Sequence, residues 1–151
     1  MKPASARKLD ELGVEYRLIR LRDRAVTVQD VIDHADGHLD PSEICKTIIV
    51  KDRRGTKYAV FLRGRDRIDF NKLKPVLGKV SVARRDEVQE ATDVEPGAVC
   101  PLTLGIPVYL DERVLGLERA NFGSGDHLYG IELRTEDLAK ALSYTVLDVA
   151  G

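Results

Sequence analysis

Residues 46–64, KTIIVKDRRGTKYAVFLRG, place two apolar runs on either side of a short polar segment. In the runs over 46–52 and 57–64, apolar residues follow one another directly, which is typical of strands that are buried on both faces. The segment RRGT between them contains Gly55, the residue type that a hairpin turn favours. We therefore predict a buried β-hairpin here.

Alternating polarity and capping residues predict the elements on either side of this hairpin. Further strands are expected at 14–21, 79–83, 106–111, 119–123, 129–134 and 144–149, and helices at 5–12, 27–36, 70–78, 84–93 and 136–142. Because helices do not follow each strand in turn, a doubly wound parallel sheet is not expected. The prediction is a single mixed α/β (α+β) domain over residues 1–151, with a mixed or antiparallel, barrel-like sheet and short helices packed outside it.

The composition favours a globular cytoplasmic protein. The chain has 151 residues, of which 43% are hydrophobic and 32% charged, and this length suits one domain. No apolar run approaches the roughly 18 residues of a membrane helix, and the first residues lack the apolar core of a secretory signal. One Met and no Trp, beside many Arg and Glu, indicate a thermophilic source.

The cysteines and histidines do not form a metal-binding pattern. Cys45 and Cys100 are too few for a disulfide framework, and no CxxC zinc spacing occurs. His34 and His38 are four residues apart, but Gly37 between them and the Asp40-Pro41 pair that follows predict a frayed helix end. Both histidines are therefore expected on the solvated surface. A zinc site is therefore not expected.

The charge is divided unevenly along the chain. Residues 1–85 carry 20 Lys and Arg against 12 Asp and Glu, whereas residues 86–151 carry 4 against 13. Basic clusters lie at 17–24, 51–57 and 63–67. They could bind phosphate groups without base specificity, or they could be solvated edges that protect the sheet.

Three features could carry chemistry, and each also has an ordinary structural interpretation. Lys46 opens an apolar strand, so its ammonium could contact an anionic or carbonyl oxygen in a cleft, or extend from the strand edge into solvent. The loop GAVCP over 97–101 could present backbone amides to an oxyanion, or it could be a simple Pro/Gly connection. The glycine-rich loop over 122–127 could hold a small polar ligand, or it could be a wide hairpin.

Cys100 is a candidate nucleophile within GAVCP, but no histidine lies at a recognisable spacing from it. A small buried thiol is the favoured interpretation. No other side chain supplies the elements of a nucleophile–base–acid arrangement.

The order of these motifs resembles the YbaK/prolyl-tRNA-synthetase-associated domain family of aminoacyl-tRNA deacylases. The resemblance rests on KTIIVKD, YAVFLRGRDRIDFNKLKPVLG, EPGAVCPLTLGIPVYLDE and FGSGDHLYGIELRTEDLAKAL, and it runs from the Thr27 region to the last strand. It implies a mixed α/β barrel-like fold and hydrolysis of the ester of mischarged tRNA, often tRNA(Pro), without a metal or nucleotide. The implied partners are the 3′ end and acceptor stem of an aminoacyl-tRNA and prolyl-tRNA synthetase, with the protein acting as a monomer or homodimer.

The resemblance also implies roles for individual residues. Lys46 is the lysine that contacts the substrate ester or terminal ribose, and the GxxxP loop holds the carbonyl through its amides. The implied catalytic set is Lys46, Gly97, Ala98, Val99, Cys100 and Pro101, and the implied substrate-binding set is Thr27, Thr47, Gly123, Ser124 and Gly125.

One position departs from the family pattern. Some members carry Asp or His just before the last IEL-like strand, where this chain has Gly130, and Asp126 or His127 could substitute. This departure leaves open a tRNA- or synthetase-binding module that has lost catalysis. A hydrolase of another small acyl ester is a third possibility.

Overall fold

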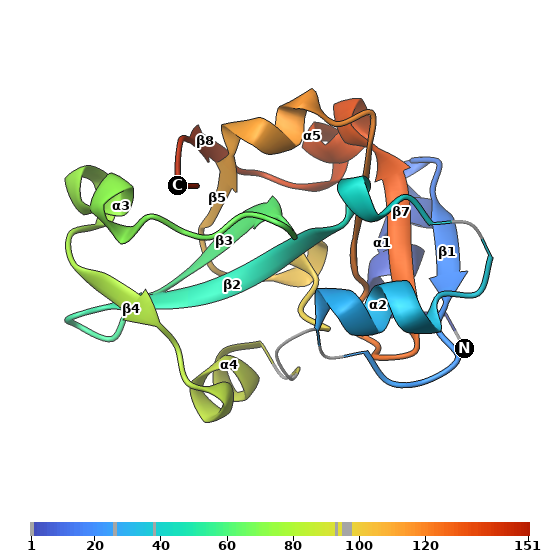
Figure 1. The fold of residues 1–151 in the computed structure, drawn as a ribbon, viewed down its shortest axis with the longest axis horizontal. Helices are drawn as coiled ribbons and strands as arrows, with labels where there is room; N and C mark the ends of the chain where they lie inside the picture. The colour runs from blue at the N-terminus through green and yellow to red at the C-terminus, as the bar shows by residue number, and fades with distance from the viewer. Residues whose placement is uncertain (1, 26, 38, 93, 95–97) are drawn as a thin grey trace.

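The computed structural model describes residues 2–25, 27–37, 39–92, 94 and 98–151, and its strands form two sheets (Figure 1). The larger sheet has the order β4-β2-β3-β5-β8 and the smaller has the order β1-β7-β6. The strands are β1 (Arg17–Arg20), β2 (Cys45–Asp52), β3 (Lys57–Arg63), β4 (Val80–Val82), β5 (Val108–Asp111), β6 (Arg119–Gly123), β7 (Tyr129–Arg134) and β8 (Thr145–Leu147).

The helices are short and lie outside the sheets (Figure 1). They are α1 (Ala4–Leu12), α2 (Val28–His34), α3 (Phe70–Leu77), α4 (Arg85–Thr92) and α5 (Leu138–Ala141). Short 3₁₀ turns cover Pro41–Glu43, Pro101–Thr103, Glu112–Gly116 and Thr135–Asp137. Within the described ranges, no helix is both long enough and apolar enough to cross a membrane.

The mixed α/β class with outer helices is confirmed. β2 pairs antiparallel with β3 and β4, whereas β3–β5 and β5–β8 are parallel pairs. The barrel-like sheet needs a correction, because the two sheets do not close into a barrel. Among the described residues, the isolated bridge between Ile44 and Asn121 joins the beginning of β2 to β6, so the sheets meet at a corner instead of along a continuous ladder.

The central hairpin is buried on both faces, as its sequence predicts. Side chains of a strand alternate between faces, so neighbouring residues of β3 enter different cores. Phe61 belongs to the core formed with β6, β7 and α5, and Val60 and Leu62 belong to the core formed with α3. β2 divides in the same way, with Ile49 in the first core and Val50 in the second.

The turn of this hairpin is organised by Asp52 and Gly55. The carboxylate of Asp52 accepts hydrogen bonds from the backbone N–H groups of Arg54 and Thr56, both at 2.9 Å. Gly55 has φ +84°, a left-handed conformation that glycine adopts without the cost that a Cβ imposes. The expected glycine at this turn is therefore explained by its backbone angle.

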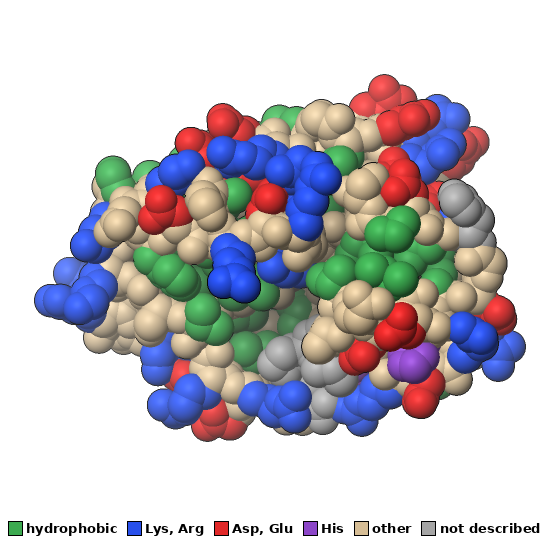
Figure 2. All heavy atoms as spheres, in the orientation of Figure 1, with side chains coloured by type: hydrophobic (Ala, Val, Ile, Leu, Met, Phe, Trp, Pro, Cys, Tyr) green, Lys and Arg blue, Asp and Glu red, His purple; other side chains and the backbone are tan. Residues whose placement is uncertain are grey.

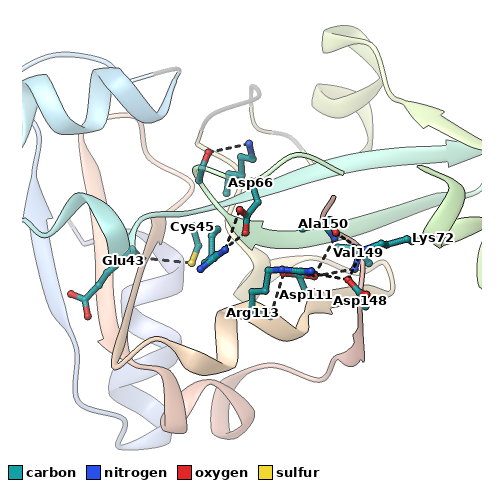
Figure 3. Close-up of polar contacts among 12 residues, drawn as sticks. Glu43, Cys45, Asp66, Lys72, Asp111, Arg113, Asp148, Val149 and Ala150 are labelled. Atoms are coloured by element: carbon teal, nitrogen blue, oxygen red, sulfur yellow. Dashed lines mark hydrogen bonds and ion pairs between the residues drawn. The ribbon is translucent and has the colours of Figure 1, made fainter. Parts of the chain in front are cut away.

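The end of the chain is tied to the larger sheet by the buried carboxylate of Asp111 (Figure 3). Asp111 Oδ1 accepts hydrogen bonds from the backbone N–H groups of Val149 at 2.9 Å and Ala150 at 3.3 Å, and it contacts Arg113 Nη1 at 3.2 Å. The same Arg113 nitrogen lies 2.8 Å from Asp148 Oδ1. This network fixes the residues that follow β8.

We expect Asp111→Ala to lower the free energy of unfolding by about 3 kcal/mol, because it leaves buried donors without an acceptor. Urea denaturation monitored by circular dichroism measures this loss. The matched control is Glu136→Gln, since Glu136 is exposed and lies 3.9 Å from Arg134. Equal stability of the two variants would contradict a structural role for Asp111.

Candidate functional site

A pocket of about 350 Å³ lies between β2, α2, α4 and the smaller sheet. Figure 2 shows a hollow on this face, with hydrophobic side chains inside it and Lys and Arg side chains around it. Most of the side chains that line the pocket are aliphatic, among them Ile19, Leu21, Val31, Ile48, Ile49 and Val88. A volume of this size suits a small organic group.

Lys46 lies in this pocket near the beginning of β2. Its Nζ donates a hydrogen bond to the carbonyl oxygen of Gly64 at 3.1 Å. Burial lowers the pKa of Lys46 below its ordinary value, an effect that Asp66 opposes and Arg67 reinforces. The ammonium is therefore partly desolvated, and an anionic or carbonyl oxygen that reaches it meets less competition from water.

The two predicted threonines also line the pocket, but their hydroxyl groups differ. Thr27 caps α2: its Oγ1 accepts a hydrogen bond from the Asp30 N–H at 3.1 Å, and the Asp30 carboxylate accepts one from the Thr27 N–H at 3.1 Å. Thr47 is on β2, and its buried Oγ1 has no hydrogen-bond partner among the described residues. The Thr27 hydroxyl is therefore committed to the helix, whereas that of Thr47 is buried in the wall of the pocket.

The GxxxP loop is divided between the pocket and the core. Ala98 and Val99 line the pocket, Cys100 and Pro101 are buried behind it, and Gly97 lies outside the described residues. Cys100 is not among the lining residues.

The cysteines are poor nucleophiles in this environment. Burial raises the pKa of the Cys100 thiol to about 11 and that of the Cys45 thiol to about 12. Because the thiolate is the reactive form, both groups are almost entirely unreactive at neutral pH. The preference for a buried thiol at Cys100 is thus confirmed, and its nucleophilic role is not supported.

The Gly-Ser-Gly loop holds the GxxxP loop in place. Gly123 lines the pocket, and a Cβ added to it would lie 3.0 Å from the backbone of Ala98 and Val99, which is tighter than most real Cβ contacts. The N–H of Gly125 donates to the carbonyl oxygen of Ala98 at 2.7 Å. Glycine at position 123 therefore permits the two backbones to touch.

Ser124 acts inside the protein and does not line the pocket. Its Oγ donates to the carbonyl oxygen of Tyr129 at 2.6 Å, and its own carbonyl oxygen accepts a hydrogen bond from Ser5 Oγ at 2.6 Å. Gly125, with φ +93°, also lies outside the lining of this pocket. These two residues support the wall that Gly123 forms.

Gly130 and its candidate substitutes all border the pocket. Gly130 lies on β7 opposite Ile19, with room for a Cβ at ordinary contact distances. Asp126 Oδ1 accepts a hydrogen bond from the Leu128 N–H at 2.9 Å, and His127 Nδ1 lies 3.0 Å from the carbonyl oxygen of Ala25. Both side chains are therefore held at the edge of the pocket.

Asn121 is a pocket residue that the sequence analysis missed. It lies on β6 directly opposite Glu132 of β7, and it is 3% exposed. The available signal was an amide between Ala120 and Phe122 in a predicted strand, because a polar side chain in an apolar run is more informative than an apolar one.

No group of three or more His, Cys, Asp or Glu residues that could hold a metal ion occurs within the ranges that the structure describes.

The chain belongs to the aminoacyl-tRNA editing domain family, whose sequence model matches residues 23–141. This match confirms the resemblance inferred from Lys46, the GxxxP loop and the Gly-Ser-Gly loop.

Two prolyl-tRNA ligases are similar to about two thirds of the chain. The enzyme of Syntrophotalea carbinolica is 31% identical over 105 residues, which are 65% of this chain and 18% of that protein. The enzyme of Bacillus pumilus is 32% identical over 108 residues, which are 68% of this chain and 18% of that protein. The aligned region is thus a small part of each of these larger enzymes.

Solved structures share the fold over nearly the whole chain. The crystal structure of hypothetical protein APE2540 is 30% identical, with a TM-score of 0.84, and the match covers 97% of this chain and 98% of that one. A proposed trans-editing enzyme for prolyl-tRNA synthetase is 22% identical, with a TM-score of 0.79 and coverage of 100% and 99%. At 22% identity, the similarity to the trans-editing enzyme shows a shared fold and nothing more.

We expect Gly123→Ala to lower the free energy of unfolding by about 1–3 kcal/mol, because the added methyl group must displace the backbone of Ala98 and Val99. Urea denaturation measures the loss, and ¹H–¹⁵N spectra should show shifts at both amides. Gly105→Ala is the matched control, since a Cβ there meets nothing within 4 Å. Unshifted Ala98 and Val99 amides in Gly123→Ala would refute the close contact.

Proposed function

We propose that the chain, over residues 1–151, is a single editing domain that hydrolyses the ester of mischarged tRNA in trans. The proposed substrate is tRNA(Pro) carrying a small non-cognate amino acid such as Ala or Cys. Membership of the editing family and the similarity to part of two prolyl-tRNA ligases support this choice. We place the activity in the cytoplasm.

One observation carries the proposal: three distant segments that resemble the family's motifs border a single pocket. Lys46 comes from β2, Ala98 and Val99 from the loop before the 3₁₀ turn at Pro101–Thr103, and Gly123 from the end of β6. The contacts between Gly123 and the 98–99 backbone fix two of these segments relative to each other. Such convergence of polar and backbone groups in an apolar pocket is typical of a substrate site.

In the proposed reaction, a water molecule attacks the carbonyl carbon of the aminoacyl ester. The bond between this carbon and the ribose oxygen breaks, the ribose oxygen takes a proton, and the free amino acid leaves. An ester is already activated, so positioning of the water and stabilisation of the oxyanion account for the catalysis. Water as the nucleophile agrees with the raised pKa values of Cys45 and Cys100.

Lys46 has the central part in this mechanism. Its ammonium contacts the substrate ester or the terminal ribose, giving up its hydrogen bond to the Gly64 carbonyl. The backbone amides of the GxxxP loop hold the carbonyl oxygen as negative charge develops on it. Size selection in the pocket excludes a larger cognate side chain.

The basic clusters supply the proposed contacts to the acceptor stem. The cluster over 63–67 begins at the last residue of β3 and includes Asp66 and Arg67, the two residues whose charges act on Lys46. Arg63 holds Asp66 through two hydrogen bonds, at 2.6 and 3.2 Å, which leaves Arg65 and Arg67 as the phosphate contacts. Prolyl-tRNA synthetase is a second proposed partner, and the proposed state is a monomer or homodimer.

We expect Lys46→Ala to lower kcat/KM for mischarged tRNA about 10²-fold or more, the usual cost of removing one group that stabilises a developing oxyanion. Release of labelled amino acid from a panel of mischarged tRNAs measures this loss. Lys140→Ala is the matched control, because Lys140 is an exposed lysine on α5. A wild-type protein no faster than Lys46→Ala on every tRNA would refute the deacylase.

The alternative is a tRNA- or synthetase-binding module that has lost catalysis, which Gly130 favours because it leaves no acidic or imidazole group at that position. Gel shifts of uncharged tRNA at increasing salt concentration separate the two functions. Salt-dependent binding without any hydrolysis would establish the module in place of the enzyme.

The activity should fall as the pH rises through the lowered pKa of Lys46, that is, at a pH below the 10.5 of an ordinary lysine. The charged form exists below this pKa, so the contribution of the cation is complete at lower pH and is lost above it. Measurements of kcat/KM as a function of pH, corrected for spontaneous ester hydrolysis, test this decline in activity. Lys46→Arg should remove the decline, because a guanidinium remains charged throughout.

A further inference from the structure

The charge of the surface changes sign across the pocket. Residues 27–43, which include α2, carry five Asp and Glu and neither Lys nor Arg. Residues 46–85, which include the β2–β3 hairpin, β4 and α3, carry 13 Lys and Arg against three Asp and Glu. Both segments line the pocket, so a polyanion that enters it by one end is attracted on the hairpin side and repelled on the α2 side.

Four cations gather at the tip of the hairpin, at the end of β2 that is farther from Lys46. This tip cluster consists of Arg53, Arg54, Lys57 and Lys79. Lys79 belongs to it because the next residue, Val80, pairs with Asp52 at the end of β2. None of the four makes an ion pair with a described residue, and Lys and Arg side chains mark this end of the molecule in Figure 2. Their positive charge is therefore available to an external anion.

Part of the tip cluster shares the face of the hairpin that borders the pocket. Alternate residues of a strand point to the same side, so Lys51 points to the side of Ile49, which lines the pocket. Lys57 is directly opposite Lys51 and shares this side. From Lys46 to Asp52, β2 extends about 20 Å, so only an elongated partner occupies both places.

The arginines on the other side of the pocket stand among carboxylates. Arg22 Nη2 donates a hydrogen bond to the carbonyl oxygen of Asp33 on α2 at 2.7 Å. The carbonyl oxygen of Arg20 accepts a hydrogen bond from the N–H of Asp36 at 2.8 Å. The Arg20 side chain is exposed and makes no ion pair with a described residue, so it differs from the tip cluster mainly in its acidic surroundings. The acids of residues 27–43 lower the positive potential around both arginines.

We propose that the double-stranded stem of a tRNA lies along the hairpin, with its phosphates on the tip cluster and its 3′ end in the pocket. This inference rests on the proposed function, because it assumes that the 3′ end enters the pocket. Double-stranded RNA is recognised mostly through its shape and its phosphates, so exposed cations without ion-pair partners suit it. On the opposite side, residues 27–43 would repel the same phosphates. The tip cluster thereby sets the direction in which the stem leaves the pocket.

Non-aminoacylated RNA hairpins with the acceptor stem of tRNA(Pro) and its 3′ end test this surface, with fluorescence anisotropy as the measure of binding. The double variant Arg53→Gln/Arg54→Gln should bind about tenfold more weakly, or worse, at low salt. The slope of log K against log salt concentration should become shallower by about 2, since two phosphate contacts are lost. Arg20→Gln is the matched control and should change neither quantity. Equal losses in the two proteins would overturn the direction of the stem, and unchanged binding in the double variant would overturn the surface.

Lys79→Gln tests the same surface outside the turn of the hairpin. It should make the slope shallower by about 1. Because Lys79 precedes β4 and is not part of the turn, a distorted turn cannot account for the effects of both variants. Wild-type affinity and slope in Lys79→Gln would overturn a surface that joins the two segments.

Deacylation separates this inference from the proposed function. For mischarged tRNA, the double variant should raise KM and leave kcat unchanged, because the tip cluster binds the stem and not the reacting ester. Hydrolysis with a wild-type KM in the double variant would contradict the inference and leave the deacylase supported. Weaker RNA binding by the double variant, with no hydrolysis of any mischarged tRNA by the wild-type protein, would contradict the deacylase and support the surface.

Discussion

Both faces of the β2–β3 hairpin are apolar, so each face requires its own covering layer. The smaller sheet, α1, α4 and α5 contribute to the core on one face, and α3 and the end of the chain contribute to the core on the other. Burial of apolar surface is the dominant favourable contribution to folding, and a hairpin covered on one face only would lose much of it. The division into two cores therefore determines where the remaining elements pack.

The pocket lies beside the part of β2 where the pairing of this strand with β4 has ended. β2 pairs with β4 only over Val50–Asp52 and meets β6 at the bridge between Ile44 and Asn121, so the edge of β2 between these places lies beside the pocket. Lys46 and Thr47 occupy this stretch. The same corner that prevents the sheets from closing into a barrel leaves space for a ligand beside the strand that carries both residues.

The walls of the pocket are held from behind by a part of the chain that the family match does not include. The match begins at residue 23, yet Ser5 of α1 donates to the Ser124 carbonyl, and Lys8 donates to the Leu102 carbonyl at 2.6 Å. Because Ser124 adjoins Gly123 and Leu102 follows the GxxxP loop, α1 contacts both segments that touch at the Ala98 backbone. The first helix thus belongs to the support of the pocket as well as to the core.

Much of the fold could be predicted, because alternation and caps are local properties. The buried hairpin, the Thr27 cap and the glycine at position 55 each follow from a few adjacent residues. The split into two sheets could not be predicted, since it depends on where β2 and β6 meet, 77 positions apart between Ile44 and Asn121. Lys46 and Gly123 could be identified because each belongs to a sequence motif. The places of Asn121 and Ser124 depend on contacts between distant segments, so Asn121 was missed and Ser124 was expected in the pocket although it lies behind the wall.

The raised pKa of Cys45 has a consequence for any activated acyl group that enters the pocket. Cys45 is one of the lining residues, and a thiolate there could capture an ester by transfer to sulfur, leaving the protein blocked as a thioester. With a pKa of about 12, only about one thiol in 10⁵ is ionised at neutral pH. The buried sulfur therefore fills space in the wall while remaining chemically inert towards acyl transfer.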